Sequence, residues 1–75
     1  MKFVKTIENL ANHKKALFEH DGEYFVYSYV NSQYAHETMV FRSNKAGDIE
    51  NWAEVSVHPG YMSSEFVMAE LEKTL

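Results

Sequence analysis

With 75 residues and no cysteine, the chain is long enough for one domain, residues 1–75, and it has no disulfide or thiolate zinc site to reinforce a small core. Its composition, 45% hydrophobic and 24% charged, is that of a folding chain, and the lack of cysteine favours the cytoplasm. The net charge of −4 argues against direct nucleic-acid binding, and no apolar run is long enough for a membrane span or signal peptide, so neither nucleic acid nor a membrane is an expected partner.

The first predicted element is a short helix near the N-terminus. Thr6 is a suitable N-cap because its hydroxyl can accept a hydrogen bond from the first turn. The helix would extend to about Asn12 and place Ile7, Leu10 and Ala11 on its inner side.

A β-hairpin is predicted next. The apolar runs KALFEH and EYFVYSYV are separated by Asp21 and Gly22, a pair that favours a two-residue turn because both residues accept positive φ. The predicted cross-strand pairs are His20 with Glu23, Phe18 with Phe25, Leu17 with Val26, and Ala16 with Tyr27.

Two further strands and a helix complete the predicted fold. The strands are His36–Ser43 and Trp52–His58, joined by the turn NKAGD and ended by Pro59 and Gly60. The helix covers about 64–74, with Ser63 as N-cap and an apolar stripe of Val67, Met68, Leu71 and Leu75. The prediction is therefore an α+β fold: a four-stranded antiparallel meander with a short N-terminal helix and a C-terminal helix packed on one face.

Two helices can cover only one face of such a sheet. Phe18, Phe25, Tyr27 and Tyr29 form the more apolar face and are predicted to lie under the helices. The other face would then be open, and its apolar residues would form either an ordinary patchy surface or a contact surface for a protein partner or a second copy of the chain. These residues are Leu17, Tyr24, Val26 and Val30, with Tyr24 as the first candidate for an anchor.

The acidic residues are concentrated in the second half of the chain. They are Asp48, Glu50, Glu54, Glu65, Glu70 and Glu72. Such carboxylates can face a basic surface on a partner, and the alternative is a solvated surface that serves solubility.

No pattern predicts catalysis or a cofactor. The histidines His13, His20, His36 and His58 lie near predicted strand ends but lack the spacing of metal ligands, so no metal site is expected. The serines have no nucleophile-elbow context, and the three glycines form no phosphate-binding loop.

An ordered pattern runs through HETMVF, His36 to Phe41, and GDIENWAEVSV, Gly47 to Val57. It consists of a Glu-Thr-Met-Val-Phe strand, a polar turn with Gly47, and Trp52 at the start of the next strand. This pattern resembles small phage-encoded proteins over about half of the chain. The resemblance implies an accessory protein that binds and blocks a host protein, such as an anti-CRISPR or anti-restriction inhibitor, and it implies no particular binding residues.

We therefore expect a small acidic protein-binding module, without enzymatic activity, that inhibits a host defence complex by occupying a basic or nucleic-acid-binding surface. The alternatives are a structural homodimer that buries the open sheet face on itself, and a small metal- or ligand-binding domain that uses the strand-end histidines.

Overall fold

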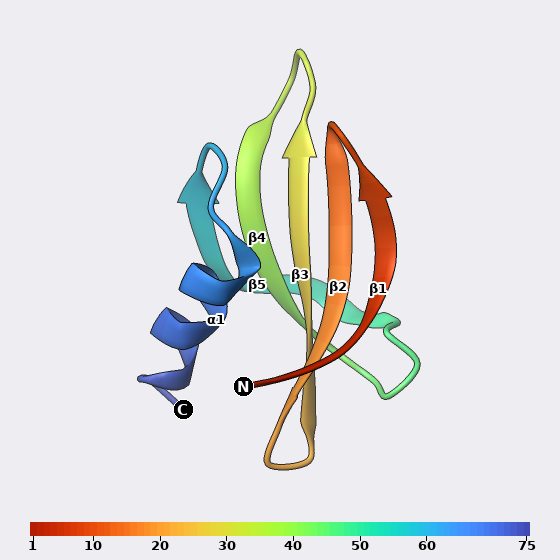
Figure 1. Cartoon of the computed structure of the whole chain (residues 1–75), viewed down its shortest axis with the longest axis vertical. Coiled ribbons are helices and arrows are strands. Elements are labelled where there is room, and N and C mark those ends of the chain that lie inside the picture. The colour runs from red at the N-terminus through yellow and green to blue at the C-terminus, as the bar shows by residue number, and fades with distance from the viewer.

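A computed structural model describes all residues, 1–75. It contains one five-stranded antiparallel sheet whose spatial order, β1-β2-β3-β4-β5, is also the order in the chain, followed by a single helix (Figure 1). The elements are β1 (Lys2–Leu10), β2 (His13–His20), β3 (Glu23–Asn31), β4 (His36–Ser43), β5 (Ile49–Pro59) and α1 (Ser64–Glu72). The predicted fold class, with four strands and two helices, was therefore wrong.

The error lies at the N-terminus, where the helix predicted from Thr6 is instead strand β1. This strand carries two bulges, one between Phe3 and Lys5 and one between Thr6 and Glu8. Each bulge adds an unpaired residue to β1, so its pairing with β2 advances by three residues where a regular strand advances by two. Apolar residues three apart, which are typical of a helix face, are compatible with a strand of this kind.

The Asp21–Gly22 hairpin was predicted correctly. Both turn residues have positive φ, 49° and 85°, and all four predicted cross-strand pairs are present. The C-terminal helix was also predicted correctly, and the Ser63 side chain accepts a hydrogen bond from the backbone N–H of Phe66.

The main core lies between the sheet and α1. Val67 and Met68 of α1 are buried against an apolar cluster on the strands, which consists of Phe18, Phe25, Tyr27, Tyr29 and Val40. Figure 1 shows α1 at the left of the sheet, beside β4 and β5. The predicted inner face is therefore the one that the helix covers.

The connection from β5 to α1 is fixed by polar contacts with the sheet. Thr38, which has no exposed surface, donates its hydroxyl to the carbonyl of Gly60 (2.9 Å) and accepts from the N–H of Met62 (3.0 Å). The Tyr27 hydroxyl donates to the carbonyl of Met62 (2.7 Å). These bonds satisfy buried polar groups and set the position at which α1 begins.

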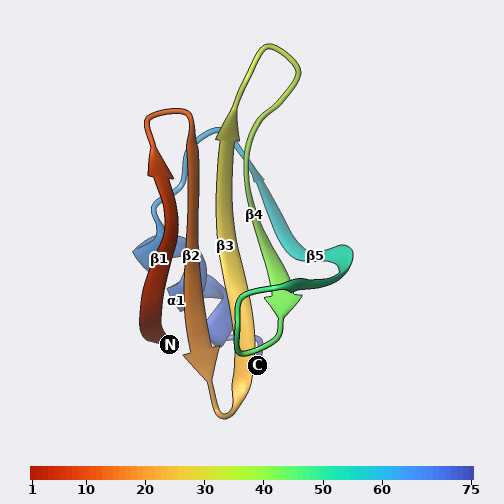
Figure 2. The ribbon, with the colours of Figure 1, turned by 90° about the vertical axis from the view of Figure 1, so that its right-hand side faces the viewer.

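The reverse face of the sheet is partly covered by the chain's own β4–β5 connection. Figure 2 shows this connection passing in front of β3, on the side opposite α1. Leu17 and Val26 have no exposed surface, and Phe41 is 5% exposed. A carbon added at Gly47 of the connection would lie 3.1 Å from Cδ1 of Ile7 and 4.0 Å from Cδ2 of Leu17, so the backbone is close to both strands. The reverse face is not open, contrary to the prediction.

The chain has no helix with the length and apolar character needed to cross a bilayer.

Candidate functional site

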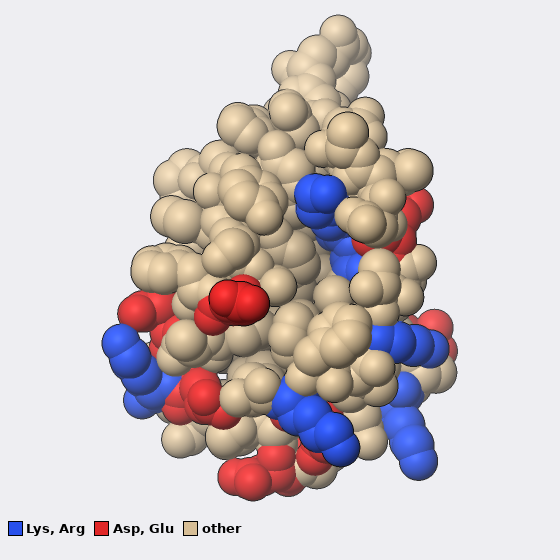
Figure 3. Space-filling view, in the orientation of Figure 1, with Lys and Arg blue, Asp and Glu red and all other residues tan.

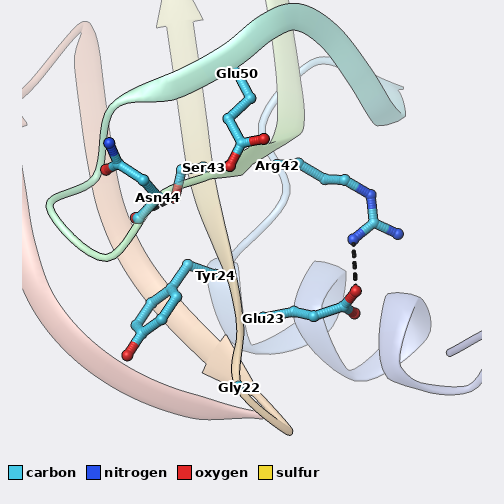
Figure 4. A pocket seen from close by; sticks show the side chains of 7 residues that line it. All are labelled: Gly22, Glu23, Tyr24, Arg42, Ser43, Asn44 and Glu50. Atoms are coloured by element: carbon cyan, nitrogen blue, oxygen red, sulfur yellow. Dashed lines mark hydrogen bonds and ion pairs between the residues drawn. The ribbon is translucent and has the colours of Figure 1, made fainter.

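A polar recess lies at the end of the sheet where the β2–β3 turn meets the start of the β4–β5 connection. Its volume is about 420 Å³, and most of its lining residues are exposed to solvent. Three segments supply its lining: Gly22, Glu23 and Tyr24 from the hairpin, Arg42, Ser43 and Asn44 from the end of β4, and Glu50 from β5. Figure 4 shows these side chains around a common space.

The charges in the recess are two carboxylates and one guanidinium. Arg42 Nη1 lies 3.3 Å from Glu23 Oε1, and the Arg42 guanidinium lies 5.2 Å from the centre of the Phe25 ring. Arg42 is thus engaged on two sides. Glu50 forms no ion pair and turns its carboxylate into the space near Ser43 (Figure 4). The recess carries one negative charge in excess, and that charge belongs to an unpaired carboxylate.

One wall of the recess is held rigidly by Asn44. Its side-chain oxygen accepts from the N–H groups of Ala46 and Asp48, both at 2.9 Å, and its side-chain nitrogen donates to Asp48 Oδ2 at 3.2 Å. An asparagine that bonds the backbone of the following residues is an Asx turn, which follows from the sequence NKAGD. The wall is therefore formed before any ligand arrives.

The predicted carboxylates do not gather on one surface. Glu50 lines the recess, and Asp48 is bound to Asn44. On α1, Glu70 pairs with Lys73 at 3.1 Å, while Glu72 pairs with the amino group of Met1 and with His20. The remaining two, Glu54 on β5 and Glu65 in the first turn of α1, lie on different elements. Figure 3 shows acidic and basic side chains interspersed on the side of the molecule drawn in Figure 1, with most of them in the lower part.

The four residues predicted to lie on an open sheet face differ in their exposure to solvent. Leu17 and Val26 are completely buried and are not available for contact with another molecule. Tyr24 and Val30 are half-buried, and Tyr24 is the one of the four that lines the recess.

The histidines make separate contacts, and none of them lines the recess. His13 pairs with Glu8, His20 with Glu72, and His36 bonds the Tyr29 hydroxyl at 3.1 Å. No group of three or more His, Asp or Glu side chains is arranged to hold a metal ion. In the recess, the Ser43 hydroxyl donates to the Asn44 carbonyl at 3.0 Å and has no neighbouring base. The recess therefore presents polar and charged side chains to any molecule that enters it.

Of the residues predicted to contact a partner, Tyr24 and Glu50 line the recess, whereas the lining residues Glu23, Arg42 and Asn44 were not predicted. The β3–β4 register places Tyr24 opposite Ser43, and this could have been found by extending the hairpin register to the next strand. No sequence signal indicated that β5 would return Glu50 to this end of the sheet.

Comparison of the chain with protein-family models, with curated proteins and with solved structures gives no match. The resemblance to phage-encoded proteins therefore stays a prediction from the sequence.

Proposed function

We propose that this protein is a binding module that accepts an arginine or lysine side chain of a protein partner in the recess between the β2–β3 turn and β5. The observation that supports the proposal is the unpaired carboxylate of Glu50 in a preformed recess whose only cation, Arg42, is already engaged by Glu23 and by the Phe25 ring. A cation that enters would restore the charge balance.

An arginine guanidinium fits the chemistry of the lining better than a neutral group. Its planar array of N–H donors can bind a carboxylate in two parallel hydrogen bonds, and such charge-assisted bonds are stronger than neutral ones. The oxygen of the Ser43 hydroxyl, which donates its own proton to the Asn44 carbonyl, is a further acceptor at the wall. Because the recess is at the surface, its negative charge would also increase the rate of encounter with a basic partner.

The identity of the partner follows only from the resemblance to phage-encoded proteins. That resemblance implies a host protein or complex in the host cytoplasm, and a basic or nucleic-acid-binding surface on it would supply the arginine or lysine side chains. Occupation of such a surface would inhibit the host factor without any catalysis or cofactor.

The proposal is tested by titrating the ¹⁵N-labelled protein with N-acetyl-arginine amide and following backbone amide shifts. The control ligand is N-acetyl-citrulline amide, which has nearly the same shape but no charge. We expect shifts at Tyr24, Ser43 and Glu50 with the arginine ligand, with a dissociation constant on the order of 1 to 10 mM, and none with citrulline.

A matched pair of variants locates the site. Glu50→Gln and Glu54→Gln each remove one carboxylate from β5, but only Glu50 lines the recess. Binding should be lost in the first variant and kept in the second. Equal shifts with arginine and citrulline, or equal effects of the two variants, would refute the proposal.

A further inference from the structure

Trp52, the single tryptophan of the chain, is exposed on the reverse face of the sheet. Its exposed fraction is 66%, whereas a tryptophan that serves as a core residue is mostly buried. It follows the recess residue Glu50 by two positions in β5.

The backbone that carries Trp52 is in an unfavourable conformation. Asn51 and Trp52 have φ values of 58° and 49°, in the left-handed region, where a bulky side chain is rare. Both lie in an irregular part of β5, where its pairing with β4 is interrupted. Phe41 pairs with Glu54 and Ser43 pairs with Ile49. Between these two pairs β4 has one residue, Arg42, whereas β5 has four, 50–53. Left-handed residues of this kind cost free energy and are concentrated at functional sites.

The ring is nevertheless oriented by two contacts. It meets the Phe41 ring edge-on, with centres 5.8 Å apart and an interplanar angle of 71°, and Lys15 Nζ lies 5.9 Å from the ring centre. These contacts are with residues of β4 and β2, and they orient the ring over the sheet. Because the Trp52 side chain is mostly exposed, its burial in the core does not offset the free energy cost of its backbone conformation.

Trp52 lies on the reverse face, next to the part of the recess that Tyr24 and Ser43 line. The cross-strand row of Tyr24 and Ser43, which line the recess, is next to the row of Val26 and Phe41, and Phe41 supports the Trp52 ring. The Trp52 ring therefore lies beside the Tyr24 and Ser43 side of the recess, and the backbone from Glu50 to Trp52 connects the two features.

We infer that Trp52 is the apolar anchor of the same interface, in which a basic residue of the protein partner occupies the recess and an apolar residue of the partner contacts the Trp52 ring. The inference rests on the proposed function. It specifies the partner further: a segment that presents an arginine or lysine a few residues away from a large apolar side chain, the first for the recess and the second for the ring. Exposed tryptophans that are fixed before binding are typical centres of binding energy, because little freedom is lost when they are covered.

The experiment uses two peptide series, acetyl-Arg-spacer-Leu-amide and acetyl-Arg-spacer-Ala-amide, with glycine spacers of increasing length. Binding is followed by tryptophan fluorescence and by amide shifts at the recess. The fluorescence reports on Trp52 alone because the chain has no other tryptophan. At the spacer that reaches the ring, we expect the leucine peptide to bind about tenfold more tightly than the alanine peptide, which corresponds to burial of most of one leucine side chain.

Two variants separate the ring from the fold. Trp52→Asn removes the ring but keeps a residue that tolerates positive φ, and it should abolish the preference for leucine while leaving the binding of N-acetyl-arginine amide unchanged. Tyr34→Ala, at an 89% exposed position in the β3–β4 loop at the other end of the sheet, should keep the preference.

The two proposals fail in different ways. Equal affinities of the leucine and alanine peptides at every spacer length would overturn the role of Trp52 even if the arginine ligand binds. Absence of any binding of the arginine ligand at the recess would overturn the proposed function itself.

Discussion

Replacement of Leu17 by alanine tests whether the β4–β5 connection really covers the reverse face of the sheet. Leu17 has no exposed surface and lies close to Gly47 of that connection. Removal of three carbon atoms from a fully buried side chain costs about 2.4 kcal/mol in transfer free energy, and the cavity left behind raises the loss to about 3 to 4 kcal/mol. On an open face, the same change would cost much less.

The loss is measured as the change in the free energy of unfolding from urea titration, followed by circular dichroism. A loss of about 3 kcal/mol corresponds to a decrease in Tm of roughly 12 to 24 °C for a domain of this size. The total stability expected for 75 residues is about 4 to 11 kcal/mol, so Leu17→Ala would still fold at the upper end of that range. Leu17→Met, which conserves volume, should cost less than about 1.5 kcal/mol and provides a folded reference.

Leu10→Ala is the matched control because it makes the same chemical change on the neighbouring strand at a position that is 56% exposed. It should cost less than about 1 kcal/mol. If Leu17→Ala and Leu10→Ala lower the stability by the same small amount, Leu17 is not covered and the described packing of the connection is incorrect.

Two further changes test the glycine of the connection and the tyrosine that holds the start of α1. Gly47→Ala and Gly22→Ala introduce the same methyl group at positive φ, but the first methyl would lie 3.1 Å from Ile7 and the second would have no atom within 4 Å. Urea titration should show that Gly22→Ala lowers the free energy of unfolding by about 1 to 2 kcal/mol and that Gly47→Ala lowers it by more. The reverse order would contradict the close packing of Gly47. Burial raises the pKa of Tyr27 from 10.0 to about 12, so the unfolded chain loses this proton first as the pH rises, and the stability that depends on it falls between pH 10 and 12. Tyr27→Phe removes the hydrogen bond to Met62 and should lower the free energy of unfolding by about 1 kcal/mol below pH 10. Above that pH, the difference in stability between the variant and the wild type should disappear. A difference that stays constant with pH would show that Tyr27 does not titrate in this way.

The parts of the fold that were predictable are those specified by neighbouring residues. The Asp21–Gly22 turn requires two positive φ values, and few other residue pairs accept them. Ser63 caps α1 with its own hydroxyl, three residues from the N–H that it binds. Each of these signals acts within a few residues and does not depend on the rest of the fold.

The N-terminal strand could not be recognised from its periodicity because bulges change the period. Lys5 and Glu8, three residues apart, lie opposite Leu17 and Lys15, which are two residues apart. The same spacing places residues on one side of a helix. Its assignment to a strand depends on pairing with β2, which is information from outside the segment.

The candidate site was only partly predictable for the same reason. Tyr24 and Glu50 were selected by residue type, but their proximity depends on the path of the β4–β5 connection across the sheet. Along that path, Gly47 lies close to Ile7 and Leu17, two residues on other strands. Sequence patterns describe the faces of single elements and contain little about which connection will cover them.

The order of the strands has a consequence for how this protein forms in the cell. Every strand pairs only with its neighbours in the chain, so each new strand can join the sheet as soon as it leaves the ribosome. The helix follows all five strands in the chain, and its Val67 and Met68 cover aromatic residues of β2 and β3 that leave the ribosome earlier. Until the helix emerges, a half-built sheet exposes Phe18, Phe25 and Tyr27 to solvent, and this interval is the one in which a nascent chain is most open to aggregation or to capture by chaperones.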